Sequence, residues 1–234
     1  MRYLWAAATH QGMVRDSNED SVFPTASGES SDDVLVIVAD GMGGHVAGEV
    51  ASRIAINAAA STDVDPADRV AAGNRAIREE VARDPGLDGM GTTMTLLQIE
   101  DAVARFAHVG DSRAYLLRDG ELRQVTDDHT VAAEYVAKGQ LSPEEAASHP
   151  QRHMLVRTLG LTRFVNIDEV TVELRAGDRL LLCSDGLTEM VKDDAIARTL
   201  VEGTPDEVVW KLVEMANNAG GVDNITVVVV EALD

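Results

Sequence analysis

Three apolar runs, two of them rich in β-branched residues, each stand next to an aspartate, and this arrangement constrains the fold more than any other feature. The run at 34–39 ends at Asp40, the run at 179–184 ends at Asp185, and Asp223 comes just before the run at 225–230. Short apolar runs bounded by glycine are typical of buried strands. A buried strand fixes its end residue, and a neighbouring glycine lets the backbone approach a ligand. One such aspartate alone is most simply a turn residue, so the hypothesis rests on the set.

The other patterns predict an α+β fold of stacked, mostly antiparallel sheets flanked by helix pairs. Helical periodicity covers 49–61 and 66–83, and Thr204 with Glu207 forms a capping box for a helix that runs to about 218. Asp119-Gly120 lies between two strand-like runs and predicts a hairpin. Strands at both ends and helices in blocks of two do not fit the regular alternation of a parallel sheet.

Residues 127–160 differ in character from the segments around them. They are polar and helix-prone, and Ser142 followed by Pro-Glu-Glu predicts the start of a short helix. We interpret this segment as an inserted, more mobile element. A length of 234 residues otherwise suits one domain, residues 1–234.

The charge balance excludes several kinds of partner. With 40 acidic against 20 basic residues the net charge is -20, which repels nucleic acid and anionic membranes. We therefore expect no nucleic acid or membrane partner, and we expect a monomer. No segment approaches the ~20 apolar residues of a membrane span, so none is expected to cross a bilayer. The first residues lack a signal-peptide layout. The single cysteine, Cys183, lies in an apolar run and is expected to be a buried thiol, so the chain suits the reducing cytoplasm.

Aspartates gathered at strand ends would repel one another unless a cation neutralised them. Hard cations such as Mg²⁺ and Mn²⁺ prefer oxygen ligands and keep several waters. Two such ions ~4 Å apart, bridged by a carboxylate and a water, form a hydrolytic site.

Six motifs together resemble the metal-dependent protein serine/threonine phosphatases of type 2C (the PPM family), especially its bacterial members. They follow the family's order and approximate spacing along nearly the whole chain. The motifs are Arg15–Asp20, Ala39–Gly44, Gly91–Thr93, Val109–Arg113, Ser184–Gly186 and Asp223–Asn224. Each motif alone is weak, but six in order are specific. The resemblance implies a four-layer α-β-β-α sandwich in which 127–160 is the flap beside the active site.

The resemblance also implies a role for each matching residue. Two Mn²⁺ or Mg²⁺ ions would be bridged by Asp40. One ion would bind the Gly41 carbonyl and, through water, Glu19; the other would bind Asp185 and Asp223. Asp20 would orient the waters, and Asp111 would contribute to a third, weaker metal site. Arg15 would clamp the substrate phosphate, because its planar guanidinium suits phosphate oxygens. Thr92, Thr93 and Asn224 would support these residues rather than take part in the chemistry.

The expected reaction is direct hydrolysis of phosphoserine or phosphothreonine by a water that bridges both metals, in opposition to a bacterial Ser/Thr protein kinase. The eukaryotic pattern has a histidine two residues after the bridging aspartate, where this chain has Met42. A metal-bound water, His45 or His153 could therefore protonate the leaving group, while His129 is expected to make only local hydrogen bonds. The sequence leaves open a phosphatase for small phosphate esters and a catalytically silent binding module.

Overall fold

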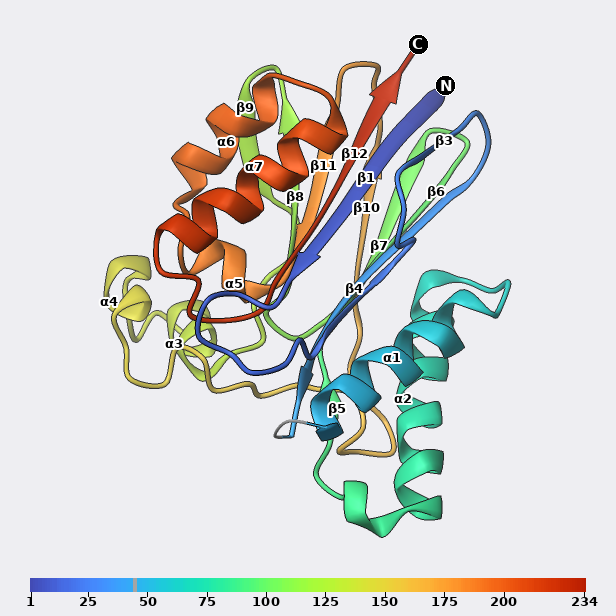
Figure 1. The fold of residues 1–234 in the computed structure, drawn as a ribbon, viewed down its shortest axis with the longest axis vertical. Helices are drawn as coiled ribbons and strands as arrows, with labels where there is room; N and C mark the ends of the chain where they lie inside the picture. The colour runs from blue at the N-terminus through green and yellow to red at the C-terminus, as the bar shows by residue number, and fades with distance from the viewer. Residues whose placement is uncertain (44–45) are drawn as a thin grey trace.

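The computed structural model describes residues 1–43 and 46–234, and the part described contains two six-stranded antiparallel sheets (Figure 1). The first sheet has the order β3-β1-β12-β11-β8-β9, and the second has the order β10-β7-β6-β4-β2 with β5 paired to the end of β4. The strands are β1 Arg2–His10, β2 Asp20–Phe23, β3 Gly28–Ser30, β4 Val34–Met42, β5 Gly91–Thr92, β6 Met94–Glu100, β7 Val103–Val109, β8 Arg113–Arg118, β9 Glu121–Gln124, β10 Asp168–Glu173, β11 Arg179–Cys183 and β12 Ile225–Leu233.

Helices cover the outer face of each sheet, so the four-layer α-β-β-α prediction is confirmed (Figure 1). One pair packs on the second sheet and the C-terminal helices pack on the first. The helices are α1 Val46–Ala60, α2 Pro66–Arg83, the 3-10 turn η1 Pro85–Leu87, α3 Val131–Ala137, α4 Pro143–Ala147, α5 Asp185–Thr188, α6 Asp193–Val201 and α7 Pro205–Asn218. No helix in 1–43 or 46–234 combines the length and apolar character needed to cross a bilayer.

The inner strands are apolar on both sides because both of their faces are buried. In β12, Val228 and Val230 pack between the two sheets, whereas Val227 and Val229 pack against the helices. In β4, Val36 and Val38 likewise face the other sheet. Since side chains alternate along a strand, the run of four valines is what a strand between two apolar layers requires.

The predicted helices 66–83 and 205–218 are confirmed, and α7 begins with the capping box of Thr204 and Glu207. The helix predicted at 49–61 begins earlier, at Val46. Two predictions near the aspartates were wrong in detail. Strand β11 stops at Cys183, so that Asp185 opens α5 rather than ending a strand. The sequence patterns predicted no strand at Asp20, yet this residue begins β2, because antiparallel pairing with β4 extends to it.

The flap, residues 127–160, contains α3 and α4 and lies beside one end of the sheets (Figure 1). Ser142 caps α4 with a complete capping box, as predicted. The flap is tied to the second sheet by Arg157, whose Nη1 lies 2.6 Å from Oδ1 of Asp168, and by His129, whose Nε2 lies 3.1 Å from Oδ2 of the same residue. These contacts are partly buried, so they hold the base of the flap in place.

Candidate metal centre

The aspartates gather where the layer between the two sheets ends. Asp20 and Asp40 are paired across β2 and β4. Asp40 continues the alternation of Val36 and Val38, so it lies on the strand face that looks toward the first sheet. From the first sheet, the Ser184 hydroxyl donates to Asp20 Oδ2 at 2.7 Å and joins the two sheets. The interior between the sheets therefore changes from valine and leucine to carboxylates at this end.

Asp40 is fixed by the neighbouring Gly91–Thr93 segment. Its backbone N–H donates to Thr93 Oγ1 at 3.0 Å, and its carbonyl accepts from the Thr93 N–H at 2.9 Å and the Thr92 hydroxyl at 2.8 Å. Gly41 must be glycine, because a Cβ there would collide with the carbonyl oxygen of Gly48 in α1. Thr92 and Thr93 thus support Asp40 through its backbone, as expected.

Asp185 and Asp223 come from two adjacent segments of the first sheet. Asp185 comes two residues after the end of β11, and Asp223 lies in the turn before β12. The two segments touch so closely at Gly186 that a Cβ there would collide with the Asn224 carbonyl. Asp223 Oδ1 accepts from the Asn224 N–H at 2.8 Å, which orients its carboxylate.

Arg15 and Glu19 lie in the loop between β1 and β2, and Asn224 holds this loop in place. Asn224 Nδ2 donates to the carbonyls of Gln11 at 2.9 Å and Ser17 at 2.8 Å, and its Oδ1 accepts from the Glu19 N–H at 2.8 Å. Asn224 is buried, so these three bonds are shielded from water. The supporting role predicted for Asn224 consists in positioning this loop.

Arg15 reaches across to the aspartates. Its Nη2 lies 2.6 Å from Oδ2 of Asp223, while its side chain remains 53% exposed. The guanidinium therefore stands at the edge of the carboxylate cluster, with one side toward an aspartate and the other toward solvent. That position suits a group that meets an incoming anion.

The crowding of the carboxylates has a clear electrostatic signature. Burial and the charges of Asp20 and Asp185 raise the pKa of Asp40 well above its usual range. Burial and the charge of Asp111 do the same to the pKa of Asp185. Burial raises the pKa of Asp20 to about 6, even though hydrogen bonds from Thr226 and Ser184 oppose it. The site disfavours its own negative charge, as a cluster built for cations does before they bind.

Two buried oxygens support the same interpretation. Within the described residues, Asp20 Oδ1 and Asp185 Oδ1 are shielded from solvent and have no hydrogen-bond partner. A buried carboxylate oxygen without a partner is costly, so its retention calls for a ligand. The donors in this cluster are carboxylate and carbonyl oxygens, which is the set that Mg²⁺ and Mn²⁺ prefer. The residues therefore fit the metals implied by the resemblance.

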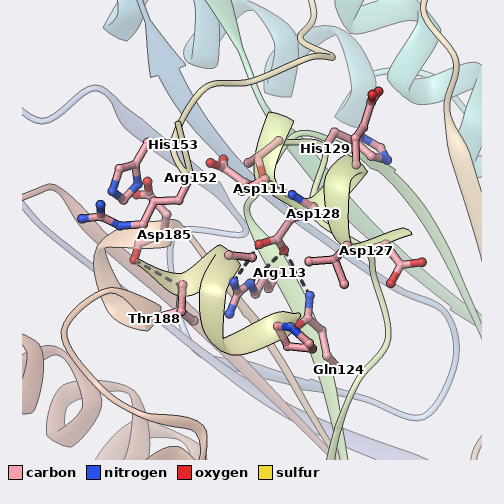
Figure 2. Close-up of a pocket in the computed structure, with 18 of the residues that line it drawn as sticks. Asp111, Arg113, Gln124, Asp127, Asp128, His129, Arg152, His153, Asp185 and Thr188 are labelled. Atoms are coloured by element: carbon pink, nitrogen blue, oxygen red, sulfur yellow. Dashed lines mark hydrogen bonds and ion pairs between the residues drawn. The ribbon is translucent and has the colours of Figure 1, made fainter. Parts of the chain in front are cut away.

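Asp111 lies beside this cluster and lines a cavity under the flap. Burial and the charge of Asp128 raise the pKa of Asp111 to about 7. Its neighbour Ser112 exchanges a 2.7 Å hydrogen bond with Thr93, which links the Asp111 loop to the Asp40 backbone. The cavity has a volume of about 1010 Å³ and also exposes Asp185 (Figure 2). Asp111 thus stands between the aspartate cluster and the flap.

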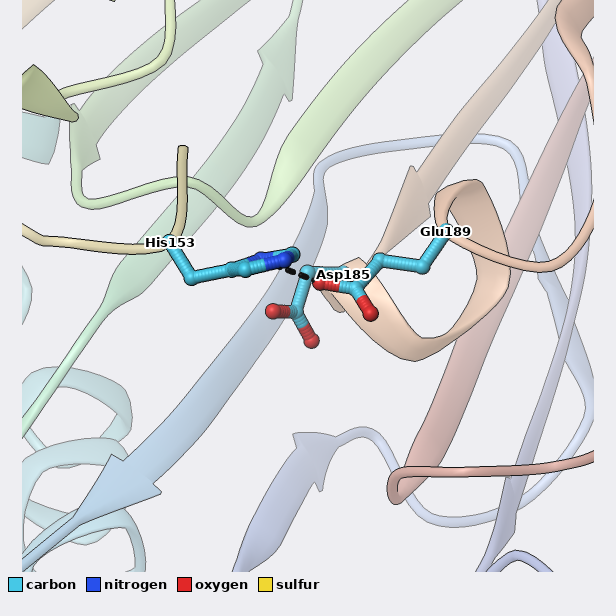
Figure 3. A group of neighbouring side chains, drawn as sticks. All are labelled: His153, Asp185 and Glu189. Carbon is cyan, nitrogen blue, oxygen red and sulfur yellow. Dashed lines mark ion pairs between the residues drawn. The ribbon is translucent and has the colours of Figure 1, made fainter. Parts of the chain in front are cut away.

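His153 is the flap residue that points at the cluster. Its Nδ1 lies 2.5 Å from Oε1 of Glu189, one helical turn after Asp185 (Figure 3). Ligand atoms of His153, Asp185 and Glu189 all lie within 4.8 Å of one another. Between the two histidines considered as general acids, the structure brings His153 to the site, while His45 lies outside the described residues. His129 accepts from the Gly110 N–H and contacts Asp168, which lie 19 and 39 positions away, so its hydrogen bonds are not local as expected but join the flap to the second sheet.

Sequence reasoning missed two residues of the site, Ser184 and Glu189. Ser184 was quoted only as part of a motif, although its hydroxyl joins the two sheets at Asp20. Glu189 stands four residues after Asp185, and this spacing would have placed both on one side of a helix.

Comparison with known proteins decides the family. The protein phosphatase 2C family profile matches residues 9–214. The chain belongs to the protein phosphatase 2C family. PstP, a serine/threonine protein phosphatase of Mycobacterium tuberculosis, is 44% identical over 239 residues, which cover 98% of this chain and 45% of PstP. The chain therefore spans about half the length of that relative. The protein phosphatase PhpP of Streptococcus pneumoniae is 39% identical over 237 residues, covering 95% of this chain and 94% of PhpP.

Solved structures of this phosphatase family have the same fold. A crystal structure of M. tuberculosis PstP superposes with a TM-score of 0.91 at 43% identity, over all of both chains. Another structure, of the PstP catalytic domain in complex with two manganese ions, superposes with a TM-score of 0.88 at 41% identity. This chain thus has the catalytic fold of the bacterial, metal-dependent serine/threonine protein phosphatases.

Proposed function

We propose that this chain hydrolyses phosphoserine and phosphothreonine on proteins, with Mn²⁺ or Mg²⁺ as cofactor. The observation that carries the proposal is the cluster of Asp20, Asp40, Asp185 and Asp223, with Arg15 at its edge. Such a cluster needs cations, and Arg15 supplies a positive group facing solvent beside them. The catalytic domain of PstP, which shares this fold, is known in complex with two manganese ions.

Two ions would be held by residues of β4, of the loop between β1 and β2, of the start of α5 and of the turn before β12. Asp40 would bridge both ions. The Gly41 carbonyl and, through water, Glu19 would serve one ion, and Asp185 and Asp223 would serve the other. Asp20 would orient the waters through its oxygen that has no protein partner. Asp111 would contribute to a third site, because it lies next to Asp185 on the flap side.

When bound, the two ions would supply an activated water at neutral pH and neutralise charge on the phosphate. Arg15 would bind the phosphate oxygens from the solvent side, with its bond to Asp223 fixing the direction of the guanidinium. His153 would donate a proton from Nε2 to the leaving oxygen, since Glu189 holds the Nδ1 side of the ring. The structure therefore supports His153 as the general acid, while His45 lies outside the described residues.

No residue is needed to form a covalent phosphoenzyme. Cys183 is fully buried, and burial raises the pKa of its thiol to about 12, so the thiolate that would be the nucleophile is absent at neutral pH. Because this one cysteine is a buried thiol, the reducing cytoplasm suits the protein. We place residues 1–234 in one catalytic domain that acts as a monomer on proteins phosphorylated by a bacterial Ser/Thr kinase.

The test compares substrates after removal and return of metal. EDTA is expected to stop hydrolysis of a phosphothreonine peptide, and added Mn²⁺ to restore it. Asp40→Ala and Asp185→Ala are each expected to abolish turnover while the fold, checked by circular dichroism, is kept. If sugar phosphates are hydrolysed as fast as the phosphothreonine peptide, so that the peptide part of the substrate makes no difference to the rate, the enzyme is a phosphatase of small esters. Normal activity of either variant would refute the assignment of the metal ligands.

A further inference from the structure

The cavity under the flap is lined by four arginine and lysine side chains, and two of them make no ion pair within the described residues, although Lys192 feels the charge of the exposed Asp194. Arg113 is paired with Asp128 at 2.6 Å, and Arg157 with Asp168 at 2.6 Å. Arg152 of the flap and Lys192, just before α6, make no ion pair or side-chain hydrogen bond within the residues described, and both are exposed. In a chain with a net charge of -20, unpaired cations beside an acidic site call for an explanation.

The carboxylates of the cavity wall do not supply the missing partner, because most are already engaged. Glu189 is paired with His153, and Glu134 with Lys138. Asp111 and Asp185 belong to the candidate metal cluster. Asp127 is exposed and makes no ion pair within the described chain, but Figure 2 shows it at the opposite end of the cavity from Arg152.

A single contact joins the two segments that carry these cations. Arg152 directly precedes His153, and Lys192 follows Glu189 by three residues. The 2.5 Å contact between His153 and Glu189 (Figure 3) therefore joins the flap backbone to the α5–α6 segment. Each of these two segments carries one of the cations. Both side chains line the cavity that also exposes Asp185. An anion beside the metal centre could thus meet a guanidinium from one wall and an ammonium from the other.

We infer that Arg152 and Lys192 form an anion subsite, and that the preferred substrate carries a second anionic side chain close to the phosphorylated residue. This inference rests on the proposed phosphatase function and narrows its substrate class. The second anion is a carboxylate or another phosphate, since a guanidinium and an ammonium bind both. A cavity of 1010 Å³ is about 10 Å across, which corresponds to ~3 residues of extended chain. The second anion therefore lies within about three residues of the first.

The experiment uses three phosphothreonine peptides that differ at one neighbouring position, which is alanine, glutamate or a second phosphothreonine. With Mn²⁺ bound, wild type is expected to show a higher kcat/KM on the glutamate or the doubly phosphorylated peptide than on the alanine peptide. Arg152→Gln and Lys192→Gln are each expected to lower this ratio up to about fivefold, because exposed ion pairs are of that strength. Since the ratio is taken within one variant, a general loss of activity cancels.

The matched control is Lys211→Gln, which removes an exposed lysine of α7 that does not line the cavity. It should leave the ratio unchanged. Higher ionic strength should reduce the preference of wild type, because salt screens exposed charges. A preference for glutamate alone or for the second phosphate alone supports the subsite and identifies its anion. Equal kcat/KM on all three peptides in wild type, or an unchanged ratio in a variant that combines Arg152→Gln with Lys192→Gln, would overturn it. If no peptide is cleaved, the proposed function itself has failed.

Discussion

Replacing Asp111 by asparagine is expected to stabilise the metal-free protein. The side chain is buried near other acids, and burial with the charge of Asp128 raises its pKa from 3.8 to about 7. Asparagine keeps the shape of the protonated acid but cannot ionise. At pH 8 wild type must hold this carboxylate charged in an unfavourable place, and the variant does not.

The magnitude follows from the pKa values of the folded and unfolded states. A difference between 3.8 and about 7 corresponds to about 4 kcal/mol, on the order of 1.4 kcal/mol for each pH unit. For a chain of 234 residues, this free energy amounts to roughly 10 °C in the midpoint of thermal unfolding. Because the folded pKa is raised, the folded state binds the proton more tightly. Wild type therefore loses this stability as pH rises from ~4 to ~7, and the difference from the variant is constant above that range.

The assay is thermal unfolding in EDTA, followed by circular dichroism at pH 4.5, 6 and 8. The midpoint of Asp111→Asn should exceed that of wild type only slightly at the lowest pH and increasingly toward pH 8. Asp33→Asn, a change at an exposed aspartate, is the matched control and should shift the midpoint very little. Added Mn²⁺ should reverse the order, because wild type keeps a ligand that the variant lacks. If the metal-free variant unfolds at or below the wild-type temperature at pH 8, the electrostatic interpretation of the cluster is refuted.

Two further substitutions test the loop that carries Arg15. Arg15→Ala should raise KM for a phosphopeptide about tenfold, because a charge-assisted hydrogen bond to the phosphate is lost. The affinity for Mn²⁺, measured by calorimetric titration, should change less. A larger change in Mn²⁺ affinity than in KM would make Arg15 a structural residue. Asn224→Ala removes three hydrogen bonds to the loop and should lower the free energy of unfolding by about 3 kcal/mol in chemical denaturation. Asn166→Ala, at an exposed position, should cost less than about 0.5 kcal/mol, and an equal effect would disprove the role of Asn224.

Local sequence patterns determined most of the secondary structure. The capping box at Thr204 and the Asp119-Gly120 hairpin depend only on neighbouring residues, so they were predictable from the chain itself. The apolar run at 225–230 predicted a buried strand, and the structure shows that both faces of β12 are buried. Strand β2 was missed, because four residues acquire their extended form only by pairing with β4.

The residues of the candidate metal centre also fall into two groups, those that the sequence indicated and those whose contacts only the tertiary structure showed. The ordered motifs indicated Asp40, Asp185 and Asp223 because glycine and apolar strands mark such positions in the sequence. Only the tertiary structure showed that Ser184 from one sheet bonds Asp20 from the other, and that Glu189 holds His153. Each of these contacts joins residues that are far apart in sequence, so no local pattern encodes it. The electrostatic character of the cluster arises in the same way, because the carboxylates raise one another's pKa values only once folding has buried them together.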